Sequence, residues 1–220
     1  KRVVDAIVNT LDFTSSEAAD DLEAMRAHVH AYEDYHALQK ALADNGWIAF
    51  VADGSMLARL SGVSQLPMED AVAFESPESL RREVTLPHAG LVKGMAIEPG
   101  VTVIVGGGYH GKSTLLNALQ RGVYAHIPGD GRELVATVDD AVKVRAADGR
   151  AVTGVDVSPL ITELPGGADT ARFTTENASG STSQAASIME AIELGTRLLL
   201  IDEDSSASNL LMRDSRMRTL

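Results

Sequence analysis

The chain contains no cysteine. This absence excludes disulfide bonds, thiolate metal sites and cysteine nucleophiles among its 220 residues. A reducing compartment is compatible with that composition, and we expect a cytoplasmic protein. No segment approaches the ~20 consecutive apolar residues that a membrane-spanning helix requires. The start of the chain also lacks the charged-then-apolar pattern of a secretory signal. We therefore expect no membrane partner.

Positive charge is scarce as well. The sequence has 19 Lys and Arg against 31 Asp and Glu, which gives a formal net charge of -12. Binding to a nucleic-acid backbone needs clustered Lys and Arg, and here the basic residues are scattered. Nucleic acid is therefore a partner that the charge balance does not favour. The composition, 45% hydrophobic and 23% charged, is ordinary for a globular protein.

The spacing of apolar residues outlines the secondary structure. Spacings of three and four predict one long amphipathic helix over residues 16–45. We interpret its histidines, His28, His30 and His36, as solvated side chains, or side chains at the flank of the helix, rather than as metal ligands. Short apolar runs predict strands at 47–51, 84–86, 134–138, 142–144, 152–157 and 197–201, a further helix at 183–194, and loops at 61–80 and 163–182. Asp148-Gly149 predicts a hairpin turn between the strands at 142–144 and 152–157.

A phosphate-binding loop is the most specific motif. Residues 101–105 are β-branched almost throughout and predict a buried strand. This strand leads into a match to G-x-x-x-x-G-K-[ST], and a helix pattern follows through Leu119. In such loops backbone N–H groups cradle phosphates, and glycines allow the close approach. We expect ATP to bind at Gly106, Gly107, Gly108, Tyr109, His110, Gly111, Lys112, Ser113 and Thr114.

Acidic residues end the last predicted strand, where Asp202 and Glu203 follow residues 197–201. Lys112 is expected to reach the β- and γ-phosphates, and Ser113 together with Asp202 to hold Mg²⁺. A carboxylate at Glu203 can polarise a water molecule in line with the γ-phosphate. The predicted catalytic residues are thus Glu203 and Lys112. An acidic turn after a buried strand is the alternative reading, but the phosphate-binding loop upstream favours a role in the site.

These motifs resemble those of a known class of proteins. A strand that closes in Asp-Glu is similar to the Walker B motif of ATP-binding-cassette ATPases. Residues 178–182 resemble the signature loop of that class, and residues 206–209 resemble its D-loop. Several longer stretches are similar to the family called "predicted ATPase of the ABC class". They are residues 50–54, 76–80, 106–116, 121–133, 175–184 and 201–204.

The resemblance implies both a fold and an assembly. The expected fold is α/β: a P-loop NTPase with an ABC-ATPase-like mixed sheet, flanking helices and an antiparallel β-hairpin region. A smaller helical or αβ segment, residues 1–90, would precede an ABC-type domain at residues 91–220. In that class Ser179 and Gly180 of one subunit would complete the γ-phosphate site of the other, in a head-to-tail homodimer. Family members are longer, so we expect this chain to be part of a larger ATPase.

Some family features have no clear counterpart here. Only His88 lies where an adenine-stacking aromatic is expected, and no glutamine has the expected spacing, so we consider Asp156 or Ser158 in its place. His126 and Arg132 are open between two roles: contact with a phosphate or the opposing subunit, or a tight structural connection. For the loop containing Arg59, the choice is between a position near the nucleotide and an ordinary turn.

The function expected from these observations is Mg²⁺-dependent ATP hydrolysis, with ATP and ADP as ligands. Two alternatives stay open. The first is a nucleotide-gated module that binds nucleic acid or protein and hydrolyses slowly. The second is a P-loop kinase that phosphorylates a small molecule, although the signature-like loop counts against it.

Overall fold

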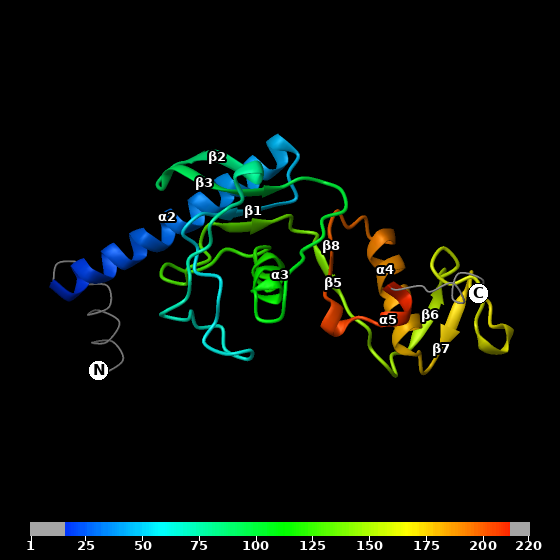
Figure 1. The fold of residues 1–220 in the computed structure, drawn as a ribbon. Coiled ribbons are helices and arrows are strands. Elements are labelled where there is room, and N and C mark those ends of the chain that lie inside the picture. Colours follow the sequence, from blue (N-terminus) through cyan, green and yellow to red (C-terminus); the bar gives the residue numbers. More distant parts are fainter. Residues whose placement is uncertain (1–15, 212–220) are drawn as a thin grey trace, which may run out of the picture. The chain divides into compact units, whose positions relative to one another are not determined.

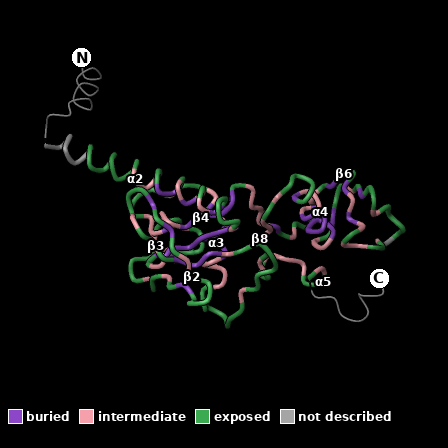
Figure 2. The backbone as a smooth tube through the Cα atoms, turned by 90° about the horizontal axis from the view of Figure 1, so that it is seen from above, coloured by how far each residue is buried: buried purple, intermediate pink, exposed green. Residues whose placement is uncertain are grey.

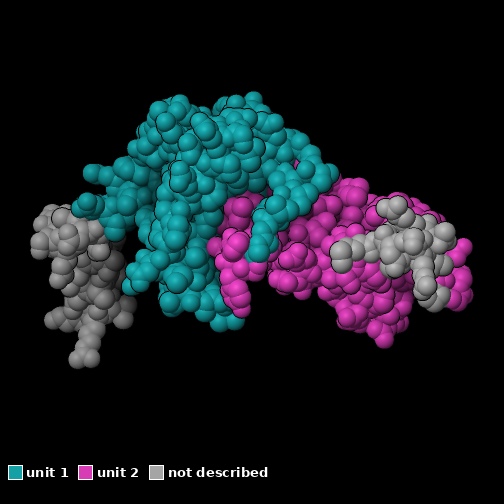
Figure 3. All heavy atoms as spheres, viewed as in Figure 1, with its two compact units in different colours: residues 1–107, 124–137 teal, residues 108–123, 138–220 magenta. Residues whose placement is uncertain are grey.

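The computed structural model describes residues 16–211 and divides the chain into two compact units. Unit 1 comprises residues up to 107 together with 124–137, and unit 2 comprises 108–123 and the residues from 138 onward (Figure 3). This division differs from the expected segments 1–90 and 91–220. Residue 90 begins the second strand of a hairpin, so a boundary there would separate two paired strands.

Unit 1 is built on a four-stranded antiparallel sheet with the strand order β2-β3-β1-β4. A long helix, α2, lies along this sheet, and its last residue is the predicted Asn45 (Figure 1). The elements are α2 (Ser16–Asn45), β1 (Ala49–Ala52), the short 3-10 helix η1 (Glu78–Leu80), β2 (Arg81–Leu86), β3 (Gly90–Ile97) and β4 (Val135–Thr137). Strand β3 was not predicted.

The core of unit 1 lies between α2 and the sheet. Tyr35, Leu38 and Leu42 of α2 are almost fully buried, and they pack with Phe50 and other sheet residues. On the neighbouring strand Gly94, which pairs with Ala52, has no Cβ, and a Cβ there would collide with the Phe50 ring and the Val51 carbonyl. The absence of a side chain at residue 94 therefore makes room for the aromatic ring on the sheet.

The apolar stripe of α2 is buried along only part of its length. Leu22, Met25, Val29 and Tyr32 keep helical spacing but are between 40% and 56% exposed. Figure 2 shows the change from exposed to buried residues along this helix. The pattern predicted the helix correctly, but only its C-terminal half packs on the sheet.

The predicted strand at residues 101–105 is wrong. These residues belong to no strand in the structure, and Val101, Val103 and Val105 are at least 72% exposed. A strand is stabilised by hydrogen bonds to a neighbouring strand. No segment between residues 16 and 211 forms that neighbour.

Unit 2 contains two small sheets, three α-helices and two short 3-10 helices among its described residues. Strands β5 and β8 pair in parallel, and β6 and β7 pair antiparallel. The elements are α3 (Lys112–Arg121), β5 (Val142–Val144), β6 (Val152–Val155), the 3-10 helix η2 (Pro165–Gly167), β7 (Phe173–Thr175), α4 (Gly180–Glu193), β8 (Leu199–Ile201), the 3-10 helix η3 (Glu203–Ser205) and α5 (Ser208–Leu211).

The strand pairing of unit 2 corrects two predictions. Residues 142–144 and 152–157 were expected to form one hairpin, but β5 instead pairs with β8 and β6 with β7. The antiparallel pair of this unit is therefore formed by β6 and β7, which a long segment containing η2 connects. Strand β7 lies in the stretch 163–182, which was expected to be loop. Helix α4 packs on these two strands through Ala185 and Ala186.

An ion-pair group ties the amino ends of β5 and β8 together. The Arg197 guanidinium lies 2.8 Å from both Asp139 Oδ1 and Asp140 Oδ2. Burial raises the pKa of Asp140, but the hydrogen bond and charge of Arg197 outweigh it and leave that pKa below its usual value. Because the two strands are parallel, their carboxyl ends also lie side by side.

The α2 core gives a stability prediction. We expect Leu38→Ala to lower the free energy of unfolding by about 2–5 kcal/mol, because it empties a site with 0% exposure. Leu22→Ala makes the same change on the same helix at a residue that is 40% exposed. It should cost no more than about 0.5 kcal/mol. Urea unfolding of both variants would measure the difference, and equal losses would contradict the packing described.

Candidate nucleotide-binding site

The phosphate-binding loop has a tightly curved backbone just before α3. Tyr109 has φ 62°, a value that residues other than glycine rarely adopt, and its side chain is fully exposed. Gly111 has φ 82° and is the N-cap residue of α3. It has no side chain to cap the helix, and the first turn contains no acidic residue. The start of α3 therefore suits an anionic ligand, because no acidic side chain in its first turn competes for that position.

The acidic residues lie at the carboxyl end of β8, as the sequence predicted. Asp202 follows the strand directly and its side chain is 13% exposed. Glu203 begins η3 and its side chain is 74% exposed. The Ser206 hydroxyl donates a 2.7 Å hydrogen bond to the Asp202 carbonyl oxygen, which fixes the turn after the strand. In parallel sheets ligands bind at this edge.

Two lysines connect the start of α3 with the end of β8 inside unit 2. Lys112 Nζ lies 3.8 Å from Glu203 Oε1. Lys143 Nζ, from β5, lies 3.3 Å from Asp202 Oδ2 and 3.2 Å from Asn117 Oδ1 of α3. The structure thus brings the predicted lysine and both predicted carboxylates together, although they come from distant parts of the sequence.

The oxygen atoms offered by Ser113 and Asp202 are of a kind that fits a magnesium ion. The Ser113 hydroxyl and the Asp202 carboxylate are hard oxygen ligands of the kind that Mg²⁺ prefers. In nucleotide sites Mg²⁺ usually keeps several water ligands and also binds phosphate oxygens of the substrate. Among residues 16–211, no group of three or more His, Cys, Asp or Glu side chains is arranged to hold a metal alone. Ser113 and Asp202 are thus the residues that would hold the ion.

The signature-like segment forms the start of α4. Ser179 is the N-cap residue, and its Oγ accepts a hydrogen bond from the Thr182 N–H at 3.4 Å. The helix begins at Gly180, three residues before the predicted Ser183. Ser179 is exposed. This places a helix N-terminus, with its partial positive charge, at the surface of unit 2.

Comparisons with known proteins assign these features to a family. A family model described as the P-loop domain of ABC_ATPase matches residues 21–220. The chain belongs to this ABC ATPase family. It is also 34% identical over 188 residues to an uncharacterized protein of Methanocaldococcus jannaschii, MJ1628. That match covers 80% of this chain and 41% of the relative, so the chain spans less than half of the relative's length.

Membership supports nucleotide binding by this ABC ATPase domain, and its mixed helices and sheets agree with the α/β P-loop fold predicted from the sequence. The roles of individual residues stay predictions. Among residues 16–211, no helix is both long and apolar enough to cross a membrane.

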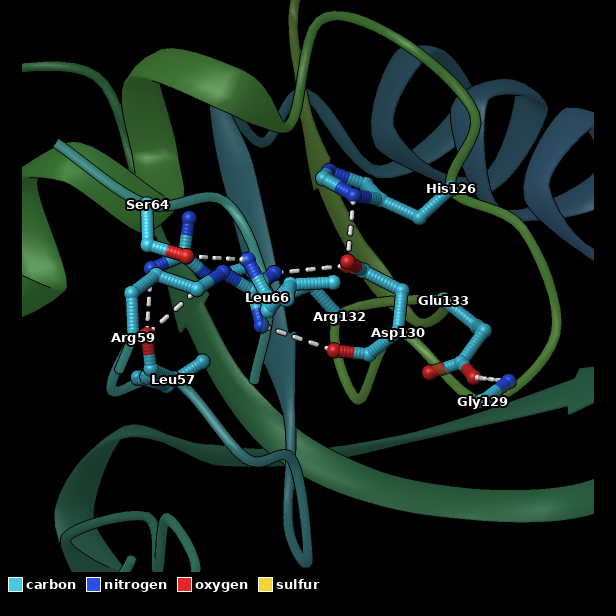
Figure 4. Close-up of polar contacts among 9 residues, drawn as sticks. All are labelled: Leu57, Arg59, Ser64, Leu66, His126, Gly129, Asp130, Arg132 and Glu133. Carbon is cyan, nitrogen blue, oxygen red and sulfur yellow. Dashed lines mark hydrogen bonds and ion pairs between the residues drawn. The ribbon is translucent and has the colours of Figure 1, made fainter. Parts of the chain in front are cut away.

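His126 and Arg132 of this ABC ATPase domain form internal contacts of unit 1. Figure 4 shows Arg59 and His126 meeting at Asp130, whose Oδ2 lies 2.6 Å from the Arg59 guanidinium and 2.7 Å from His126 Nδ1. Arg132 is 2% exposed and donates hydrogen bonds to the Leu57 carbonyl oxygen. These contacts join residues 57–59 to residues 126–132. They agree with a structural connection, which is one of the two roles left open by the sequence.

Three further candidates have local partners. The His88 ring stacks on His30 with the centroids 3.8 Å apart, so one of its faces is already covered. Asp156 accepts hydrogen bonds from the hydroxyl and the N–H of Ser158, which lower its pKa. Both residues follow β6, which is not in the same sheet as β8. The segment following β5, by contrast, contacts the turn after β8, since the Ala146 N–H donates to the Ser205 carbonyl oxygen.

Sequence reasoning missed Lys143. It lies between two valines in a short strand, where alternation alone predicts an outward, solvated side chain. Its position beside Asp202 follows from the pairing of β5 with β8, in which Lys143 is opposite Leu200. That pairing joins segments far apart in the sequence, so no local pattern predicts it.

Gln184 was missed as well. Its side chain is fully buried in α4. Gln184 Oε1 accepts a 2.7 Å hydrogen bond from the Ala207 N–H, and its Nε2 donates to Ser206 Oγ at 3.1 Å. The amide therefore connects the signature-like helix to the segment that follows Asp202 and Glu203.

Replacing this amide should loosen the segment after β8. We expect Gln184→Leu, which keeps roughly the same shape, to lower the free energy of unfolding by about 1–3 kcal/mol, because the Ala207 N–H loses its acceptor. Gln65→Leu, at an exposed position, is the matched control and should have little effect. Hydrogen exchange at Ala207 reports the loosening directly. Unchanged protection in Gln184→Leu would contradict this role.

Proposed function

We propose that this ABC ATPase domain binds ATP with Mg²⁺ and hydrolyses it. One observation supports this most strongly. The Lys112 ammonium at the start of α3 lies 3.8 Å from the Glu203 carboxylate at the end of β8. The residues proposed as the phosphate-binding lysine and the general base thus lie close together within unit 2. Family membership supports the nucleotide as ligand.

Each residue has a role that follows from its chemistry. Lys112 and the N–H groups at the start of α3 hold the β- and γ-phosphates. Ser113 and Asp202 provide the oxygen ligands for Mg²⁺. When bound, this ion supplies positive charge that offsets the phosphate oxygens.

Glu203 acts as the general base. Its carboxylate accepts a proton from water while the water oxygen forms a bond to the γ-phosphorus. The bond between that phosphorus and the β–γ bridging oxygen breaks, which releases ADP and phosphate. Without nucleotide the negative charge of Glu203 is paired with Lys112. The phosphates of ATP draw Lys112 toward themselves and leave Glu203 available for the proton.

We also propose that two copies assemble head to tail around the nucleotides. Ser179 is exposed at the N-terminus of α4, and the Glu203 side chain is 74% exposed. A second copy could therefore reach both groups without rearrangement of unit 2. In this arrangement Ser179 and Gly180 of one copy bind the γ-phosphate held by the loop of the other, and the closed dimer excludes water from the site.

The general base is tested by Glu203→Gln in the full protein. We expect ATP binding to persist and ATP turnover to fall about a hundredfold or more, because the amide cannot take the proton. ATP should also hold the variant as a dimer, which sedimentation with and without nucleotide would detect. Glu193→Gln makes the same change at an exposed position in α4 and serves as the control.

The outcomes separate the possibilities. Unchanged turnover in Glu203→Gln would refute the assignment of the base. ADP release that requires a small-molecule acceptor would indicate a kinase instead. A variant that binds ATP, loses turnover and stays monomeric would support the base but contradict the head-to-tail assembly.

A further inference from the structure

Lys143 is the most buried charged group near the candidate site. Its side chain is 6% exposed, although it belongs to the short strand β5. Its ammonium contacts Asp202 at the end of β8 and Asn117 on α3, at 3.3 and 3.2 Å. The residue therefore joins three separate elements of unit 2 at the point where Mg²⁺ is expected.

The Lys143–Asp202 ion pair balances the negative charge of Asp202 in the protein without ligands. A buried carboxylate is costly unless it is paired and hydrogen-bonded. Asp202 is 13% exposed, and its ion pair within residues 16–211 is with Lys143. The lysine thus supplies the positive charge that a metal ion would otherwise supply.

We propose that Lys143 is a built-in counter-ion of Asp202 that competes with Mg²⁺, so that the metal binds well only together with a nucleotide. This inference rests on the proposed function, since it concerns the same metal position. The physical reason is that both cations need one carboxylate, and two cations near each other repel. The phosphates of ATP bring the negative charge that lets both cations remain.

The chemistry of lysine suits this role. Its ammonium is a compact charge with three donors on a flexible stem, and it can turn away from one acceptor and keep another. Asn117 Oδ1 is such a second acceptor. Lys143 can therefore give up Asp202 to the metal and keep its contact with α3.

The competition predicts a change in the coupling between metal and nucleotide. The quantity to measure is the ratio of the Kd of a non-hydrolysable ATP analogue in EDTA to its Kd in saturating Mg²⁺. In Lys143→Gln the positive charge is removed but the side chain can still form hydrogen bonds. We expect this ratio to fall about tenfold below wild type. By thermodynamic linkage the ratio equals the factor by which the nucleotide strengthens Mg²⁺ binding, and without the competing lysine Mg²⁺ already binds Asp202 before the nucleotide arrives.

Two controls isolate the charge. Lys143→Arg keeps it and should leave the ratio close to the wild-type value. Lys93→Met removes a lysine from an exposed ion pair with Glu83 in unit 1, and it should also leave the ratio unchanged. A ratio in Lys143→Gln that stays the same or rises would overturn the proposal and make the pair a purely structural contact.

A second measurement needs no nucleotide. Without ligands, Lys143→Gln should melt at a lower temperature than wild type, and Mg²⁺ alone should restore more of that loss than it adds to wild type. An equal response to Mg²⁺ in the two proteins would overturn the proposal. If wild type fails to bind the ATP analogue at all, the proposed function fails, while this melting comparison still decides the role of Lys143.

Discussion

The pairing of lysine ammonium groups with carboxylates at the carboxyl end of β8 is the constraint on which the candidate site depends. Lys143 joins Asp202 to α3, and Lys112 joins the start of α3 to Glu203. Asp202 carries a charge that is mostly removed from water, so it needs a cation nearby. The same requirement underlies the proposed Mg²⁺ site, and the contact of Lys143 with Asn117 connects α3 to this edge of the sheet.

Around this point the local structure supplies surfaces suited to phosphate. The positive φ angles of Tyr109 and Gly111 curl the loop before α3, and α4 presents its N-terminus at Ser179. Gln184 ties α4 to the segment after Glu203. These two elements therefore share a buried, hydrogen-bonded amide. The proposed dimer would use that connection to link nucleotide binding with assembly.

The site was more predictable from sequence than the sheets. The residues of the loop before α3 and of the turn after β8 follow short motifs, whose chemistry demands particular side chains at fixed spacing. Strand pairing has no such local code. Asp148-Gly149 does form a turn, with φ 83° at Gly149, yet the strands on either side pair with distant segments. Residues 101–105 have strand composition but no partner among the described residues.

The most direct test of the account is equilibrium binding of ATP to the full protein, with Mg²⁺ and in EDTA, compared with Lys112→Ala. The account predicts saturable binding that Mg²⁺ strengthens and that Lys112→Ala weakens at least about tenfold, since a charged hydrogen bond to phosphate is lost. Equal affinity in the two proteins, or no binding to wild type, would contradict it.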